Sequence, residues 1–140
     1  MNINKTQNLS FSSLRGLGEP GNAEIFKNLS QKYGKKFFEN ADRAFQTISD
    51  LSGQRDVYIK FRTIDYRNQP PYLPEKVTDI MLFDRNGRKI TQQCIDGSQG
   101  SSSNYIIADR FRRLVNGFRN NFKCDTSLES AINNTINKFA

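Results

Sequence analysis

The chain has 140 residues, a formal net charge of +7 and no histidine, and 36% of its residues are hydrophobic. This length predicts one domain with one core. Without imidazole, the usual Ser-His-Asp and Cys-His catalytic units, nucleases that use a histidine pair, and zinc sites with histidine ligands are excluded. The sequence has no run of about 18 apolar residues, so it predicts no membrane insertion.

Residues 1–21 are predicted to form a flexible N-terminal tail, followed by a single basic α+β domain over residues 22–140. Residues 1–11 are rich in Asn, Gln and Ser, and they lack the apolar stretch of a secretory signal peptide. We therefore expect a cytoplasmic protein, or one delivered by a route that needs no classical signal peptide. Residues 9–12 fit a short edge strand within the tail.

Two helices are predicted next, because apolar residues recur at steps of three and four. Asn22 is the expected N-cap of the first helix, over residues 23–33, and Gly34 ends it. The second helix covers residues 35–51 and ends at Gly53. Its broad apolar face comprises Phe37, Phe38, Ala41, Ala44, Phe45, Ile48 and Leu51.

The middle of the chain changes to the period-two alternation of half-buried strands. A first strand is expected over residues 57–62. A second strand over 77–84 and a third over 88–95 are joined at Asn86-Gly87, the strongest hairpin signal in the chain, so they should be antiparallel neighbours. Prolines in the segment 67–76 predict a stiff connection that cannot be a central strand. The outer side of the first strand should carry Tyr58, Lys60 and Arg62.

A basic amphipathic helix over residues 104–123 is the clearest pattern in the chain, and a flexible Gly- and Ser-rich loop over 96–103 precedes it. The segment from Arg85 to Lys123 carries eight basic and two acidic residues, an excess of +6 that is most of the net charge. The apolar stripe of the helix comprises Ile107, Phe111, Leu114, Val115, Phe118 and Phe122. Within that stripe we expect burial of Phe111, Leu114, Phe118 and Phe122.

A last helix is expected from Asp125 or Thr126 to Phe139, with Thr126 and Glu129 as a capping box. Together the elements predict an α+β fold, with a small three- to four-stranded antiparallel sheet packed against about four helices.

An anionic partner is predicted, because Lys and Arg neutralise phosphates and a tyrosine ring can stack on a base. The candidate binding residues are Lys60, Arg62, Arg85, Arg88, Lys89, Tyr105, Arg112, Arg119 and Lys123. Arg112, Arg119 and Lys123 share one flank of the basic helix and are expected to contact phosphates. The alternative is that these charges form an ordinary solvated surface.

The sequence predicts no cofactor and no metal site. Its acidic residues form no paired cluster, and Cys94 and Cys124 match no metal or redox spacing. Both thiols are expected to be unpaired, because no export signal marks an oxidising destination. Asp79 and Asp84 lie five positions apart on one predicted strand, so they should face opposite sides.

Three functions stay open on the sequence alone. The first is a small basic binding domain that grips nucleic acid or an acidic protein surface. The second is a metal-independent ribonuclease toxin, in which Arg and Lys stabilise developing charge while Tyr or a carboxylate moves protons. The third is a delivered effector that acts by protein–protein contact. The sequence identifies neither a catalytic group nor the oligomeric state.

Overall fold

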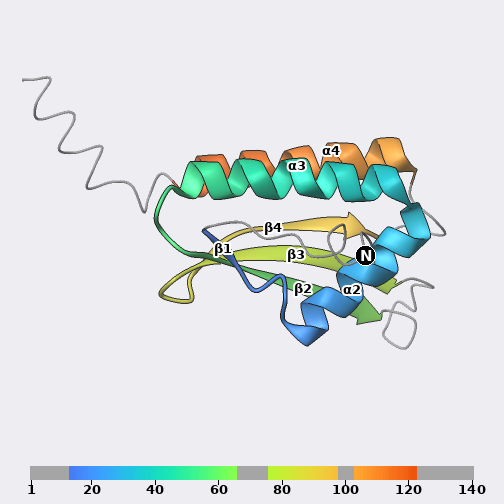
Figure 1. Cartoon of the computed structure of the whole chain (residues 1–140), viewed down its shortest axis with the longest axis horizontal. Coiled ribbons are helices and arrows are strands. Elements are labelled where there is room, and N and C mark those ends of the chain that lie inside the picture. The colour runs from blue at the N-terminus through green and yellow to red at the C-terminus, as the bar shows by residue number, and fades with distance from the viewer. Residues whose placement is uncertain (1–12, 66–75, 98–102, 123–140) are drawn as a thin grey trace, which may run out of the picture.

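The computed structural model describes residues 13–65, 76–97 and 103–122. These residues form two layers, in which helices cover one face of a four-stranded sheet of order β1-β2-β3-β4 (Figure 1). The strands are β1 (Leu14–Arg15), β2 (Val57–Asp65), β3 (Lys76–Asp84) and β4 (Lys89–Asp96). The helices are α2 (Pro20–Tyr33), α3 (Lys35–Ser52) and α4 (Asn104–Asn121). None of the helices in these ranges is long and apolar enough to cross a membrane.

The predicted α+β class is confirmed, but the prediction of a wholly antiparallel sheet is wrong. β2, β3 and β4 are antiparallel neighbours, as expected. β1, however, pairs with β2 in parallel, with Leu14 opposite Val57. A strand of two residues is too short to show a period-two pattern, which is why the sequence did not reveal it. The edge strand predicted at residues 9–12 and the helix predicted at 125–139 lie outside the described residues.

The start of α2 also differs from the prediction. The helix begins at Pro20, a residue well suited to a first turn because it has no N–H to leave unsatisfied. Asn22, the predicted N-cap, is instead buried inside that turn. Its Oδ1 accepts the Phe61 N–H at 2.9 Å, and its Nδ2 donates to the carbonyls of Ile59 at 3.0 Å and Gly16 at 2.8 Å. The Asn22 amide therefore continues the pairing of β2 beyond the point where β1 ends.

The predicted hairpin at Asn86-Gly87 is confirmed. The Gly87 N–H donates to the Asp84 carbonyl at 3.0 Å, and Gly87 adopts a φ of 83°, a conformation that favours glycine. The Asp84 carboxylate accepts the N–H groups of Asn86 at 2.8 Å and Arg88 at 2.9 Å. Asp84 thus stabilises the turn, and the alternation of β3 places it on the opposite side from Asp79, as predicted.

The core lies between the helices and the inner face of the sheet. Its centre is a set of phenylalanine rings. The ring centroids of Phe26 and Phe61 are 6.1 Å apart, and those of Phe37 and Phe111 are 5.5 Å apart. Phe37 and Phe45 are fully buried. Leu51, predicted to face inward, is instead 38% exposed, because Ser49 and Ser52 take the buried positions at the end of α3.

α4 packs against β4 and beside α3 (Figure 1). The predicted burial of Phe111, Leu114, Phe118 and Phe122 is confirmed. Two polar contacts fix the helix to β4: Asn121 Nδ2 donates to the Ile90 carbonyl at 2.8 Å, and Arg110 Nη1 donates to the Ile95 carbonyl at 3.1 Å. A Cβ at Gly117 would overlap the hydroxyl of Thr91, so glycine allows the close approach of helix and strand.

Candidate functional site

The side of the sheet that faces away from the helices is the main surface of interest, and we call it the outer face. In the described part of the chain, no helix packs on it. Val57, Ile59 and Phe61 of β2 point to the core, and the intervening residues point outward, as the alternation predicted. The outer face comprises Tyr58, Lys60, Arg62 and Ile64 of β2, Val77, Asp79, Met81 and Phe83 of β3, and Lys89, Gln92 and Cys94 of β4.

A ladder of polar side chains crosses the outer face from β2 to β4. The Asp79 carboxylate accepts from Arg62 Nη2 at 3.1 Å and from Gln92 Nε2 at 2.7 Å. Lys89 Nζ in turn donates to Gln92 Oε1 at 2.7 Å. One buried carboxylate therefore positions two of the predicted binding cations, and Lys60 adds a third on the same face, so the outer face keeps a positive charge.

Two aromatic side chains lie together at the hairpin end of the outer face. Tyr58 and Phe83 are directly opposite residues of β2 and β3, and such pairs have Cβ atoms ~4.5–5.5 Å apart. Tyr58 is 41% exposed and Phe83 is half-buried. Phe83 was missed as a site residue, although the alternation of β3 contained the signal: Phe83 is an aromatic residue in phase with Asp79 rather than with the core residues Ile80 and Leu82.

Next to this aromatic pair is an open groove with a cavity volume of about 330 Å³, at the small end of the ~300–1,000 Å³ that ligand pockets occupy. Its lining includes Tyr58, Phe83, Lys60, Arg85 and Glu19, together with backbone of Gly16 and Gly87. Within the described residues, the side chains of Lys60 and Arg85 make no ion pair or hydrogen bond. Both cations are therefore available to an anion that enters the groove.

The structure divides the predicted binding residues between two surfaces. Lys60, Arg62 and Lys89 lie on the outer face, and Arg85 and Arg88 lie in the adjoining hairpin. Tyr105, Arg112 and Arg119 lie on α4, whose apolar stripe packs on the inner face, so their side chains are exposed on the opposite side of the molecule. Lys123 lies outside the described residues.

Ion pairs already occupy part of the α4 surface. Asp109 binds Arg112 Nη1 at 3.1 Å and Arg113 Nε at 2.9 Å. Tyr105 is 85% exposed at the first turn of α4, and a rise of 1.5 Å per residue separates it from Arg119 by about 21 Å. The structure thus does not bring the aromatic and basic residues of α4 into one cluster.

One cluster of titratable groups, where α2 ends against β4, has the composition that acid–base chemistry needs. Asp96 is buried, and its carboxylate accepts from Lys32 Nζ at 3.0 Å and from the Tyr33 hydroxyl at 2.6 Å. Burial by itself lowers the pKa of Lys32, but the hydrogen bonds to Asp96 and Tyr33 outweigh it and raise the pKa above its ordinary 10.5. Lys32 is therefore a cation at neutral pH and cannot act as a base; the cluster ties α2 to β4.

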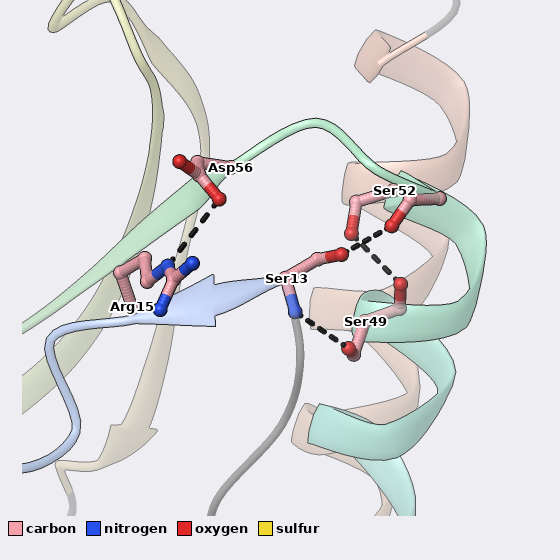
Figure 2. A network of polar contacts seen from close by, with 6 residues as sticks. Ser13, Arg15, Ser49, Ser52 and Asp56 are labelled. Atoms are coloured by element: carbon pink, nitrogen blue, oxygen red, sulfur yellow. Dashed lines mark hydrogen bonds and ion pairs between the residues drawn. The ribbon is translucent and has the colours of Figure 1, made fainter.

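A second cluster contains three buried serines, Ser13, Ser49 and Ser52 (Figure 2). The Ser13 N–H donates to Ser49 Oγ at 3.3 Å, the Ser13 hydroxyl to the Gly53 carbonyl, and the Ser52 hydroxyl to the Ser49 carbonyl at 2.8 Å. A nucleophilic serine needs an adjacent base, whereas two of these hydroxyls donate to backbone carbonyls. The cluster instead anchors the start of β1 to the end of α3, beside the Arg15–Asp56 ion pair at 3.3 Å.

The described ranges contain no group of three or more His, Cys, Asp or Glu residues that could hold a metal ion. Cys94 is half-buried on β4, while Cys124 lies outside the described residues, so the thiol state of the two cysteines stays a prediction. The chain matches no family model, no curated protein and no solved structure, and its function must be inferred from its own geometry.

Proposed function

We propose that the protein binds single-stranded nucleic acid across the outer face of its sheet. The observation that carries this proposal is the placement of Tyr58 and Phe83 side by side on the face of the sheet that no described helix covers, among the cations Lys60, Lys89 and Arg85. Aromatic side chains on a sheet stack unpaired bases, and Lys and Arg neutralise the phosphates that connect them.

The spacing of rings and charges suits this role. Lys60 follows Tyr58 by two positions along β2, so both point to the outer face about 7 Å apart. Arg85 follows Phe83 by two positions at the start of the hairpin turn and lines the same groove. Each ring therefore has a cation two residues after it in the chain, and a nucleotide with one base and one phosphate requires such a pair of a ring and a cation.

An unpaired strand fits this surface better than the other anionic partners. In a duplex the bases are already stacked on each other, so the rings of Tyr58 and Phe83 would gain no base contact. An acidic protein would use the cations but would not need two aromatic rings between them. The ribonuclease and effector alternatives stay predictions, and no observation in the described part of the chain favours either of them.

The test is fluorescence anisotropy with labelled oligouridine and oligothymidine of about eight nucleotides, within the ~4–16 nucleotides that such sites cover. Tyr58→Ala should weaken binding roughly 5- to 150-fold, since base stacking contributes ~1–3 kcal/mol per base. Tyr105→Ala is the matched control, because it removes an exposed tyrosine on the other surface, and it should leave affinity unchanged.

Three results would contradict the proposal: no binding by the wild-type protein at low salt, equal losses in the two tyrosine variants, or equally tight binding to duplex. Polyglutamate that binds as tightly as the oligonucleotides, with no loss in Tyr58→Ala, would identify an acidic protein surface as the better partner. Comparison of RNA with DNA of the same base composition separates recognition of the 2′-hydroxyl from stacking alone.

A further inference from the structure

The side chain of Glu19 lines the groove, but its carboxylate does not stabilise the surrounding structure through a hydrogen bond or an ion pair within the described residues. Glu19 is the N-cap residue of α2, a position whose side chain commonly accepts a helix N–H, yet its side chain makes no such bond. It also forms no ion pair within the described residues, although Lys60 and Arg85 line the same groove. A negatively charged hydrogen-bond acceptor is thus present beside two cations, which by themselves would favour only anions.

Both walls of the groove are fixed before any ligand enters. On one wall, the Gly16 carbonyl accepts the Glu19 N–H at 3.1 Å and Asn22 Nδ2 at 2.8 Å, which holds the turn between β1 and α2. Gly16 has a φ of 102°, and a Cβ there would lie 2.8 Å from the Ile59 carbonyl oxygen, so only glycine fits. On the other wall, the Asp84 carboxylate holds the hairpin. A preformed site loses less free energy to ordering on binding.

We infer that this groove is a subsite for one nucleotide of the bound strand and that Glu19 makes it prefer guanine. This inference rests on the proposed function. In it, the base stacks against Tyr58 and Phe83, the adjoining phosphate lies at Lys60 and Arg85, and the Glu19 carboxylate accepts hydrogen bonds from the edge of the base.

Guanine is selected because an ionised carboxylate only accepts hydrogen bonds. The Watson–Crick edge of guanine presents two adjacent donors, N1–H and the N2 amino group, which match the two carboxylate oxygens. Adenine and cytosine present an amino donor beside an acceptor nitrogen, and uracil presents one N–H between two carbonyls. Each of these three bases would place an acceptor against the negative charge of Glu19.

The experiment compares oligouridine with the same oligonucleotide carrying one central guanine, adenine or cytosine. The wild-type protein should bind the guanine oligonucleotide about 5-fold tighter than oligouridine, the low end of ~1–3 kcal/mol for a bidentate base contact, because the groove is open to solvent. Glu19→Gln should reduce this ratio towards one without weakening the binding of oligouridine. Glu24→Gln, an exposed residue of the same helix outside the groove, is the charge-matched control and should keep the ratio.

The outcomes separate this inference from the proposed function. Equal binding of all four oligonucleotides by the wild-type protein would overturn the guanine preference and leave the proposed function intact, whereas no binding at all would overturn both. A preference that survives in Glu19→Gln would remove Glu19 as its source.

Titration of GMP into ¹⁵N-labelled protein locates the nucleotide-binding site independently of the affinity measurements. The amide signals of Gly16 and Gly87 should shift, and that of Gly117 on α4 should not. Shifts confined to Gly117 would place the nucleotide elsewhere and overturn the assignment to the groove.

Discussion

The outer face of the sheet and the exposed flank of α4 both carry several cations, but their neighbours differ. On the outer face, Arg62 and Lys89 join one cross-strand ladder through Asp79 and Gln92, beside a pair of aromatic rings. On α4, Asp109 pairs with both Arg112 and Arg113, and Tyr105 lies at the far end of the helix from Arg119. A count of charges along the sequence therefore does not locate a binding surface; the groups around each charge do.

The largest effect should come from α4, through its inner side rather than its charged flank. Phe118 is fully buried and stacks on Phe122 with ring centroids 4.6 Å apart. Phe118→Ala should lower the free energy of unfolding by ~3–5 kcal/mol, because it leaves a cavity in the core. Urea denaturation measures this loss.

Tyr105→Ala on the exposed side of the same helix is the control for Phe118→Ala, and it should change stability by less than about 0.5 kcal/mol. Similar stabilities for Phe118→Ala and wild type would show that the apolar stripe of α4 does not hold the fold and that the distinction between the two surfaces is wrong.

Removal of two positive charges from one surface at a time compares the two surfaces directly. Lys60→Gln with Arg85→Gln should reduce the dependence of log affinity on log salt by about 1.4 for a single strand, because each lost phosphate contact removes ~0.7. Arg112→Gln with Arg119→Gln removes the same charge from α4 and should leave the slope unchanged. A salt titration of oligouridine binding measures both.

The opposite result would be a reduced slope in the variant with Arg112→Gln and Arg119→Gln and an unchanged slope in the variant with Lys60→Gln and Arg85→Gln. That result would support the phosphate contacts predicted from the sequence for Arg112 and Arg119, and it would contradict binding at the outer face. Neither double variant should unfold the protein, since exposed charges contribute little to stability.

The smallest expected effect concerns a cation that serves the fold. The pKa of Lys32 is raised in the folded state, so its contribution to stability is fully present below pH 10.5 and is lost as the pH rises through the higher folded pKa. Unfolding free energies of wild type and Lys32→Gln should differ by at most about 1 kcal/mol at neutral pH, given the exposure of Lys32.

That difference between wild type and Lys32→Gln should shrink above pH 10.5, which urea denaturation over an alkaline pH series can follow. A difference that grows with pH would show that the contact with Asp96 does not favour the charged lysine. Oligonucleotide binding should be unchanged in Lys32→Gln, because this residue lies on the side of the helices.

Much of the fold followed from local patterns. The period of the apolar residues predicted α3, the alternation predicted which side chains of β2 face the core, and Asn86-Gly87 predicted the hairpin between β3 and β4. These features depend on neighbours within a few residues, so the sequence contains them. The sequence did not predict the parallel strand β1 or the burial of Asn22. Both depend on contacts with β2, more than 30 residues away along the chain.

The candidate site could be predicted only in part, because it too depends on contacts between residues distant in sequence. The sequence determined that the chain is basic, that Lys60 and Arg62 share one side of a strand, and that α4 has a charged flank. Only the tertiary structure decided that the helices cover one face of the sheet and leave Tyr58 opposite Phe83 on the other. Local periodicity establishes which side of its own element a residue faces, but the packing of elements distant in sequence determines which of those sides meet.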